Sequence, residues 1–597
     1  MESHRSGRVL TMGRHVDRLR ERLLGTLDRV FPPTPQGRRA AAVCMGLLLG
    51  ERSGVHASDT AALADSGLIH LLAVSGFNVA VLAGAVIIAV RALGGRLRWA
   101  AGAALPAVSL YFLLNRHESS VARAVFMAGS IFCGILIWRR VEPLNVAGAA
   151  AILLCGTSPL LVVDAGFQLT FIAAIALIVA SRGRRQESGS RIVEAVRLTT
   201  AATIATVPVV AYHFNRVTPA AIPANLVAGP VMAVVFVLTL ILECLSLAGD
   251  APARLLAHLI TGMLNAVFFI AEGISGSRWW TWRRPTPDPM LIAAYYFVLV
   301  GRVMIRSYIP PRALAHASAI IMAFLVVAVS APIDTRTPPS GLRVTMIDVG
   351  QGESVLIESA EGERILVDGG GASGGFDLGE RVVSRALWGM GIARLDRVIV
   401  SHLDSDHAGG VAAIIRNFRP AEVWMTPGGG GDGGAMVGDI IAAASGGNAM
   451  VRMMIRGDAV CLKGTRVMVL NPGSTKASNR NEDSLVMRVD RAGRRVLLMG
   501  DAGAGTERGL TLPDLPADVL KVGHHGSTTA TTAAFVDATG PRLAFISCGR
   551  ANRFGHPDAK VLERLAGAGA RICRTDLHGM YAVDLRPLST HLHGCMP

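Results

Sequence analysis

The sequence predicts a polytopic α-helical membrane bundle followed by a soluble α/β sandwich, in which two sheets carry helices on their outer faces (αββα). Long apolar stretches are concentrated in residues 1–335, where a membrane bundle is expected. The later residues alternate between short apolar runs typical of strands and helices of ordinary polarity. Residues 1–339 hold 31 Arg, no Lys and 17 acidic residues, whereas residues 340–597 hold 28 basic and 27 acidic residues. The net charge of +15 therefore belongs mainly to the first half.

Four segments follow from this division. Residues 1–39 are basic and precede only a short apolar run without a small-residue cleavage site. We therefore expect an amphipathic helix on the membrane surface rather than a cleaved signal peptide. A multi-spanning domain is expected over residues 40–332, a Pro-rich linker over 333–341 and the sandwich over 342–590.

Ten apolar stretches in the first half are each compatible with a helix across ~30 Å of hydrocarbon, although several are short enough to be re-entrant. Three Arg-rich loops fall on alternate connections, so the positive-inside rule predicts that they are cytoplasmic. This topology accounts for the basic charge better than nucleic-acid binding does, and it places the sandwich on the external or periplasmic side. The stretches are 68–90, 99–115, 121–138, 144–163, 166–181, 198–212, 223–249, 252–274, 289–306 and 316–332.

Short apolar runs in the second half predict the strands of the sandwich. A Glu-Gly turn lies between the second and third of these strands, which predicts a hairpin. A helix is expected near 378–390. The predicted strands are 343–348, 354–358, 364–368, 397–400, 422–425, 466–470, 484–490, 494–499, 519–522, 543–546 and 580–584.

Four candidate metal ligands follow the strand that ends at residue 400. They are His402, Asp404, Asp406 and His407 in the run SHLDSDHAGG. Imidazole nitrogens and carboxylate oxygens at this spacing can converge on two adjacent cations, with His402 and Asp404 facing one and Asp406 and His407 the other. The alternative is an acidic helix N-terminus with satisfied histidines.

Two further strand ends supply the remaining candidates. Asp501 follows one apolar strand, and His524 and His525 follow another. Together with SHLDSDH, these motifs resemble the metallo-β-lactamase superfamily, so the predicted fold is a metallo-β-lactamase-like sandwich. The resemblance implies that Asp501 bridges two metal ions and that His524 or His525 closes the second site. No His occurs between His407 and His524, so the superfamily's usual third His of the first site is absent.

The expected cofactors are two divalent metal ions, Mn, Mg or Zn. A carboxylate in place of an imidazole at Asp404 shifts the preference from zinc toward manganese or magnesium. Two cations ~3.5–4 Å apart suit hydrolysis of a phosphodiester, so the sequence predicts a two-metal phosphodiesterase or nuclease. Asp406 is expected to bind metal and hold the attacking water, and His556 to donate a proton to the leaving oxygen.

Several polar residues near the predicted site have either a structural or a substrate-binding interpretation. They lie in tight turns at strand ends or in loops next to the candidate ligands, and Arg553 is a candidate phosphate contact. The set of expected substrate contacts is Gln351, Asp368, Asn481, Ser527, Asn552 and Arg553.

Polar side chains also occur inside the apolar half. Within a membrane such groups require partners, and they tend to face a bundle interior or a water-filled path. We expect them to line a conduit, with Arg123 paired to Asp164; the alternative is that they form hydrogen bonds that hold the helices together. These residues are His70, Ser75, Asn78, Arg123, Asp164, Gln168, His213 and Asn225.

The membrane motifs GLIHLLAVSGFNV, SVARA and DAGFQLTF, followed by the hydrolase motifs, are similar to the ComEC family of competence membrane proteins over roughly residues 40–585. The resemblance implies uptake of DNA across the cytoplasmic membrane during transformation. One strand would be transported and the other degraded by the hydrolase domain, with other competence-machinery proteins as partners. Members usually carry further N-terminal helices and an OB-like domain, which residues 1–40 are too few and too basic to supply.

Two other functions compete with DNA uptake. A membrane-tethered metallo-hydrolase that acts on another phosphodiester would need no transport by the first half. An inactive scaffold is suggested only by the missing third His.

Overall fold

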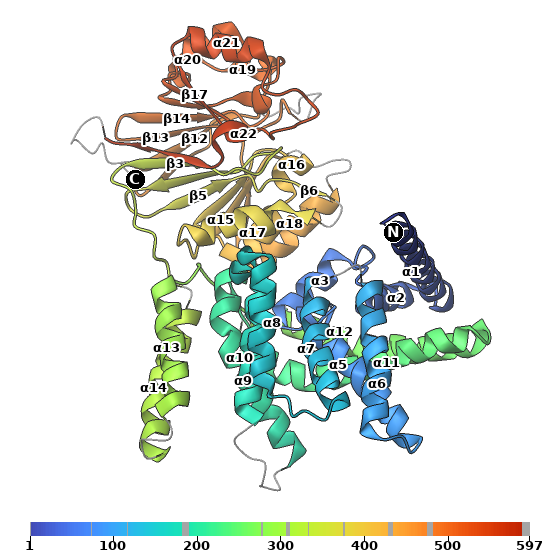
Figure 1. The fold of residues 1–597 in the computed structure, drawn as a ribbon. Helices are drawn as coiled ribbons and strands as arrows, with labels where there is room; N and C mark the ends of the chain where they lie inside the picture. The colour runs from blue at the N-terminus through green and yellow to red at the C-terminus, as the bar shows by residue number, and fades with distance from the viewer. Residues whose placement is uncertain are drawn as a thin grey trace. The chain divides into compact units, whose positions relative to one another are not determined.

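The computed structural model describes residues 2–587 apart from 73, 116–117, 182–189, 276–278, 306–310, 332, 374–375, 428–433 and 474–480. The chain forms two compact units, Met1–Ala331 and Pro332–Pro597 (Figure 1). The first unit is helical, and the second contains mixed sheets. The predicted fold class, a helical membrane bundle followed by an αββα sandwich, is confirmed.

Each of the ten predicted apolar stretches lies wholly or largely in a helix of the first unit. Five helices, α6, α7, α10, α11 and α12, are long and apolar enough to cross a membrane, and the described residues contain five shorter apolar helices. The chain is therefore a multi-pass membrane protein. The helices are α1 (Glu2–Val30), α2 (Pro35–Leu49), α3 (Ala57–Asp65), α4 (Ile69–Leu72), α5 (Gly76–Ala92), α6 (Leu97–Leu114), α7 (Ser119–Leu136), α8 (Pro143–Thr157), α9 (Ala165–Ser181), α10 (Arg191–Phe214), α11 (Ala221–Ser246), α12 (Asp250–Ser275), α13 (Pro289–Ile305) and α14 (Pro311–Ser330).

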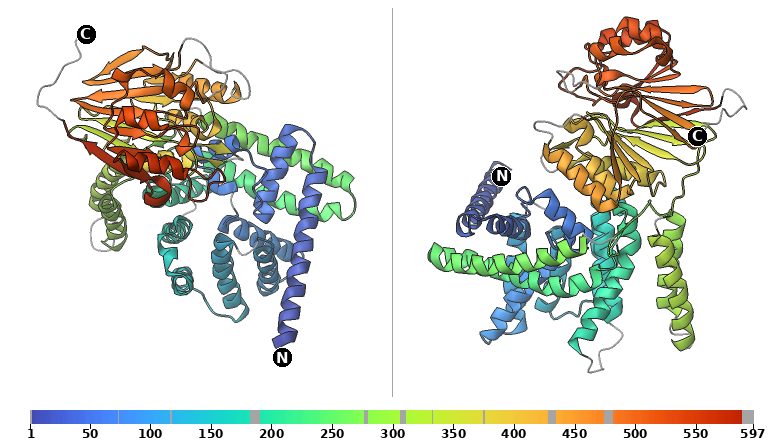
Figure 2. Two further views of the ribbon diagram at one scale, coloured as in Figure 1. Left: turned by 90° about the horizontal axis from the view of Figure 1, so that it is seen from above. Right: turned by 180° about the vertical axis from the view of Figure 1, so that it is seen from behind.

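The long helices α11 and α12 pack along one another and run across the direction of α5, α6 and α7 (Figures 1 and 2). Small residues allow this close packing, because Ala224 and Ala228 of α11 and Ala253 and Ala257 of α12 are almost fully buried. The first unit is thus held by apolar and small-residue contacts over most of its helices.

The C-terminal end of α2 lies inside this unit, where its last carbonyl groups need hydrogen-bond donors. Asn78 donates to the carbonyl of Leu47 (3.2 Å), as does Tyr111 (2.7 Å). Asn115 donates to the carbonyl of Leu48 (3.2 Å), and Arg20 donates to that of Leu49 (2.5 Å). We call Arg20, Asn78, Tyr111 and Asn115 the α2 carbonyl cluster.

The second unit is built from two seven-stranded sheets. The first has the order β10-β9-β8-β5-β4-β3-β18, and the second β11-β12-β13-β14-β15-β16-β17. The first contains β3 (Leu342–Met346), β4 (Val355–Ser359), β5 (Arg364–Val367), β8 (Arg397–Val400), β9 (Glu422–Met425), β10 (Met450–Met453) and β18 (Tyr581–Leu585). The second contains β11 (Ala459–Leu462), β12 (Thr465–Asn471), β13 (Val486–Arg491), β14 (Arg494–Leu498), β15 (Val519–Lys521), β16 (Leu543–Ile546) and β17 (Arg571–Arg574).

Helices cover the outer face of each sheet (Figure 1). The first sheet carries α15 (Ser384–Gly389), α17 (Val411–Phe418) and α18 (Gly434–Gly447), and the second carries α19 (Ala504–Gly509), α20 (Ala533–Thr539) and α21 (Ala559–Gly567). A core that includes Ile357, Trp424, Val489 and Phe545 packs between the sheets. The described part of the unit therefore has the layers expected of an αββα sandwich.

Three parallel strands position the candidate ligands. β8 pairs in parallel with β5 and β9, and β14 and β15 pair in parallel with each other. His402 follows the end of β8, Asp501 follows β14, and His524 follows β15. Because these strands end at the same edge of the sandwich, the ligand loops of both sheets meet there.

Candidate metal centre

The loop after β8 runs into α16 (Ser405–Ala408) and brings two histidines into the interior. His402 is 1% exposed and His407 is 0% exposed. The loop can pass close to its neighbours because it ends in glycine: a Cβ at Gly410 would lie 2.2 Å from the carbonyl oxygen of Gly369. The Gly-Gly pair of the motif is therefore required by backbone packing.

Hydrogen bonds fix the ring of each buried histidine. His407 Nδ1 lies 2.7 Å from Asp368 Oδ2, and His525 Nδ1 lies 2.9 Å from the carbonyl oxygen of Ser547. Carboxylate and carbonyl oxygens only accept, so both Nδ1 atoms carry the proton and both Nε2 atoms are left to bind other groups.

The ring of His402 is also protonated at Nδ1, but it is fixed indirectly, through Ser401. Ser401 Oγ donates to Asp368 Oδ2 (2.6 Å), so its oxygen is left to accept from His402 Nδ1, 3.1 Å away. His402 Nε2 is buried and has no hydrogen-bond partner among the described residues. A buried nitrogen lone pair without a donor is what a metal ligand presents before its ion is bound.

These Nε2 atoms converge around Asp501. Its carboxylate oxygens lie 3.2 Å from His407 Nε2, 3.6 Å from His525 Nε2 and 4.0 Å from His402 Nε2. His407 Nε2 and His525 Nε2 are only 3.3 Å apart. Two lone pairs at that distance repel unless a proton or a cation lies between them, so the donor set fits divalent metal.

Asp404 and Asp406 complete the arrangement. Asp404 Oδ2 lies 3.7 Å from His402 Nε2, and Asp406 Oδ2 lies 3.5 Å from His525 Nε2. Ligand atoms of His402, His407 and Asp501 lie within 4.8 Å of one another, and so do those of Asp406, His407 and His525. The predicted ligands are therefore brought together, in two overlapping groups.

The pKa values reflect burial and mutual charge. Burial, followed by the neighbouring His407, lowers the pKa of His402 to about 3, so this imidazole is neutral. Burial opposes a charge on His407 as well, but Asp501 and Asp368 raise its pKa well above the usual value. Burial would raise the pKa of Asp406, but the hydrogen bond to His525 and the charges of His407 and His525 hold it at about 2.

The adjacent residues His524 and His525 occupy different positions in the site. Both have left-handed backbone, with φ of 46° at His524 and 52° at His525, a strained conformation that concentrates at functional sites. His525 is 2% exposed and lies among the other ligands. His524 lies at the rim, with Nε2 3.8 Å from Asp501 Oδ2 and 3.4 Å from Asn481 Nδ2.

His556 is also at the rim, where its ring centroid is 5.9 Å from that of His524. Asn552 fixes this loop, because its side chain donates to the carbonyl of His556 (2.7 Å) and accepts from the same residue's N–H (3.0 Å). Burial, His524 and His525 lower the pKa of His556. Asn552 is thus a loop-stabilising residue, while His556 faces the centre's rim.

The other expected substrate contacts divide into accessible and inaccessible residues. Asp368 is fully buried, accepts from the N–H of Ser401 and contacts His407 Nδ1, so it supports the ligands in this structure, and its contact with substrate stays a prediction. Ser527 is 6% exposed and lies 3.0 Å from Thr529 Oγ1. Gln351 accepts from the N–H of Gly549, and the exposed Arg553 lies over the ring of Phe554.

Sequence reasoning missed three residues that support the ligands. Lys521 and Glu353 form a buried ion pair beneath the site, and Ser547 orients His525. An Lys next to the His-His motif was a visible signal, because a buried strand rarely ends in Lys without a partner. Nothing in the sequence marks the backbone carbonyl of Ser547.

The polar residues of the first unit bind mostly to neighbouring helices or to their own. Gln168 Oε1 and His213 Nε2 meet at 3.0 Å, and Asn78 belongs to the α2 carbonyl cluster. Arg123 donates to Thr170 and Ser119 and interacts electrostatically with Asp164, whose carboxylate also accepts from the N–H of Phe167. The remaining three contact their own segment of the chain. Asn225 hydrogen-bonds the carbonyl of Ala221, His70 hydrogen-bonds the carbonyl of Gly67, and Ser75 is the N-cap of α5.

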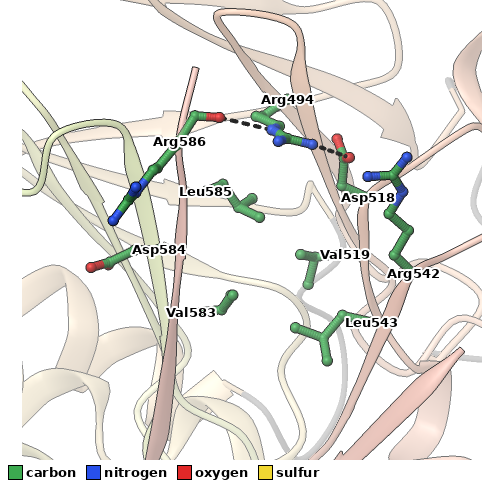
Figure 3. A pocket seen from close by; sticks show the side chains of 9 residues that line it. All are labelled: Arg494, Asp518, Val519, Arg542, Leu543, Val583, Asp584, Leu585 and Arg586. Atoms are coloured by element: carbon green, nitrogen blue, oxygen red, sulfur yellow. Dashed lines mark hydrogen bonds and ion pairs between the residues drawn. The ribbon is translucent and has the colours of Figure 1, made fainter. Parts of the chain in front are cut away.

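A cavity of about 370 Å³ lies away from the ligand cluster, at the edge where β14, β15 and β16 begin (Figure 3). Arg494 lies between the carboxylate of Asp518 (2.9 Å) and the carbonyl of Arg586 (2.8 Å). None of the candidate ligands lines it. The lining residues are Arg494, Asp518, Val519, Arg542, Leu543, Val583, Asp584, Leu585 and Arg586.

Two family models match the chain. The model described as Competence protein matches residues 47–308, and the model described as Metallo-beta-lactamase superfamily matches residues 347–550. The two matches fall on the two structural units.

Relatives extend over nearly the whole chain. ComE operon protein 3 of Bacillus subtilis is 26% identical over 94% of this chain and 73% of its own length. Competence protein ComA of Neisseria gonorrhoeae is 28% identical over 89% of this chain and 73% of its own length. The solved structure of CmlA, a diiron beta-hydroxylase from Streptomyces venezuelae, is 15% identical over 51% of this chain and 64% of that chain, with a TM-score of 0.31.

Proposed function

We propose that the chain is a ComEC-type protein, with a Competence protein domain followed by a metallo-beta-lactamase superfamily domain, and that it carries DNA across the cytoplasmic membrane during natural transformation. The second unit would hydrolyse phosphodiester bonds of the strand that is not transported. The partners would be DNA, membrane lipid and other competence-machinery proteins. The observation that carries the nuclease proposal is the convergence of His402, His407 and His525 around Asp501.

The donor set divides between two ions. His402, Asp404 and Asp501 would hold the first, with His524 at the rim in the place of the absent third His. Asp406, His407 and His525 would hold the second together with Asp501, which bridges. Of the two adjacent histidines, His525 would therefore close the second site.

Divalent ions bound there would supply a water of lowered pKa and neutralise charge on the reacting phosphate. Asp406 suits the task of holding that water, since its low pKa keeps it ionised and its side chain is 37% exposed. His556 would transfer a proton to the leaving oxygen from its imidazolium form, which its lowered pKa makes a stronger acid than an ordinary histidine. Arg553, Gln351 and Asn481 would contact the substrate at the rim.

Transport belongs to the first unit. Arg123, Gln168 and His213 lie on three different helices and connect α7 with α9 and α9 with α10, so they would border the path of the strand. The Arg-rich loops favour a second unit on the external or periplasmic side, where incoming duplex would reach it.

The competing function, a tethered hydrolase of another phosphodiester, is favoured by one observation. Asn78, Asn225 and His70 donate to or lie against backbone carbonyls, as helix-stabilising residues do. This function requires no transport phenotype from any variant of the first unit.

The test uses the full chain reconstituted in liposomes with fluorescently labelled duplex DNA and added Mn²⁺, Mg²⁺ or Zn²⁺. We expect metal-dependent cleavage outside and protection of one strand inside. Asp406→Ala should abolish cleavage, and Arg123→Ala should block protection while leaving cleavage intact. Cleavage without protection in the wild type would support the tethered hydrolase, and no cleavage with any metal would refute the nuclease.

A further inference from the structure

Lys521 ends β15 in the interior of the second unit, directly beneath the metal centre. It is 1% exposed, and its ammonium forms an ion pair with Glu353, which is 0% exposed. The ammonium also donates to the carbonyl of Gly500 (2.8 Å) and lies 4.0 Å from Asp501 Oδ1. Gly500 is the residue before the bridging carboxylate, so Lys521 holds the turn that carries Asp501.

Glu353 belongs to the other sheet. It lies between β3 and β4, and its N–H donates to the carbonyl of Asp406 (3.2 Å). Its own carbonyl accepts from the N–H of Gly370, in the loop after β5. The backbone of Glu353 is thus attached to the ligand loop that follows β8, while its side chain is attached to Lys521.

The metal ligands come from the two sheets in separate sets. His402, Asp404, Asp406 and His407 follow β8 of the first sheet, and Asp501, His524 and His525 follow strands of the second. An ion bound between the sets requires that their separation be fixed to a few tenths of an ångström. The apolar core between the sheets does not fix it alone, since such cores tolerate rearrangement more readily than a metal site does.

We propose that the buried Lys521–Glu353 ion pair is a positioning device that joins the two sheets beneath the site and sets the spacing of the two ligand sets for a pair of divalent ions. This inference rests on the proposed metal-dependent hydrolase function. Glu353 also groups with Asp368 and His407, but it lies near His407 Nδ1, the ring nitrogen already bonded to Asp368, and not near Nε2, which faces Asp501; neither residue of the pair is a ligand in this assignment. Lys521 acts on Asp501 through the Gly500 carbonyl, and Glu353 acts on Asp406 through the Asp406 carbonyl.

Energetic reasoning supports a role beyond stability. A buried ion pair costs desolvation energy that its attraction barely repays, and a well-packed apolar pair of similar volume is often as stable. The metal centre also brings four carboxylates close together, those of Asp368, Asp404, Asp406 and Asp501. The ammonium of Lys521 lies 4.0 Å from the Asp501 carboxylate, so its positive charge offsets part of their negative charge. The pair therefore supplies a fixed link and a fixed positive charge where an apolar core would supply neither.

The test measures Mn²⁺ binding to the full chain in detergent micelles, with electron paramagnetic resonance of the bound ions. Two Mn²⁺ that share a bridging carboxylate give an exchange-coupled spectrum that depends on their spacing. We expect Glu353→Gln and Lys521→Met each to weaken Mn²⁺ binding about 10–100-fold and to reduce the coupled signal. The double variant Lys521→Met/Glu353→Met should regain thermal stability, because no charge is left unpaired, but not the coupled signal.

Glu358→Gln is the matched control. Glu358 is a buried glutamate of β4 whose ion pair with Arg336 (2.6 Å) lies at the other end of the strand, so its loss should lower stability without changing the spectrum. The proposal is overturned if Glu353→Gln binds Mn²⁺ and shows the coupled signal as the wild type does, or if the double variant regains that signal. It is also overturned if the wild type does not bind two coupled Mn²⁺ ions. Coupled ions in a wild type that cleaves no DNA would refute the nuclease and leave this inference standing.

Discussion

Two buried polar clusters, one in each unit, use the same kinds of atoms in opposite ways. In the α2 carbonyl cluster, the side-chain donors of Asn78, Tyr111 and Asn115 end on backbone carbonyls of α2. In the metal centre, Nδ1 of each histidine is bound, whereas the Nε2 atoms of His407 and His525 face each other at 3.3 Å and that of His402 has no hydrogen-bond partner in the described chain. The first cluster is largely complete in itself, whereas the second presents converging nitrogen and carboxylate groups that fit a divalent cation.

This difference separates structural from functional polar residues more sharply than residue type does. A buried Asn or His in an apolar unit has a structural role when its donors and acceptors form hydrogen bonds with the backbone, because a buried polar group without a partner costs ~1–3 kcal/mol. Lone pairs that converge on one point and find no donor indicate a ligand. Removing residues from each cluster should therefore affect different properties, and the following variants test that separation.

The largest effect is expected from Asp501→Asn. The substitution keeps the size of the side chain but removes the charge that lies within 4.0 Å of His402, His407, His524 and His525. Metal-dependent hydrolysis should fall by about a thousandfold or more, equivalent to about 4 kcal/mol. Steady-state cleavage assays measure it. Activity within tenfold of the wild type would show that Asp501 does not bridge the ions.

Removal of metal is the next test. A cation that binds only the folded site at 1,000 times its dissociation constant stabilises the protein by about 4 kcal/mol. Chelation should therefore lower the unfolding temperature of the second unit and leave that of the first unchanged, as measured by scanning calorimetry with and without EDTA. Asp406→Ala, which removes a ligand of the second ion only, should show a smaller chelator effect than the wild type. A shift in the first unit would mean that its polar cluster also binds the ion.

The adjacent histidines allow a matched pair of variants. His525→Ala should weaken Mn²⁺ binding at the second site about 100-fold, because its buried ring is fixed on Ser547 and lies among the ligands. His524→Ala should weaken the first site about tenfold, because its ring is at the rim and 3.8 Å from Asp501. Titration calorimetry resolves the two. Equal loss at both sites from either variant would contradict the division between ions.

The sequence locates best those strands that precede candidate ligands and are buried on both faces. The boundaries of β8, β9 and β16 agree with the predicted ones, because apolar runs with sharp polar ends mark strands buried on both faces. Within the two seven-stranded sheets three strands were missed, β10, β11 and β17, which are sheet edges with mostly exposed or half-buried residues and no clear alternation. Their positions follow from pairing with neighbours rather than from local pattern.

The surroundings of several predicted site residues could not be read from the sequence, for one common reason. Asp368 follows a strand in a Gly-rich turn, a pattern typical of exposed loops, but pairing of β5 with β8 places it beneath Ser401 and His407. The roles of His524 and His525 depend on two left-handed backbone conformations, which adjacency in the sequence does not reveal. Asn78 likewise reads as a conduit residue until the end of α2 is seen to lie against it. Each role is set by contacts that are distant in the chain.

The smallest effect is expected in the α2 carbonyl cluster. Tyr111→Phe removes the hydroxyl that donates to Leu47 (2.7 Å), but Asn78 still donates to the same carbonyl. The free energy of unfolding of the first unit should fall by only about 1 kcal/mol, in line with hydrogen bonds between membrane helices. Unfolding in mixed micelles measures this, with Ser109→Ala as a control because its hydroxyl binds only the carbonyl one turn earlier in α6. Unchanged stability combined with loss of DNA uptake would show that this cluster serves transport, and the distinction between complete and incomplete polar clusters would then fail for the membrane unit.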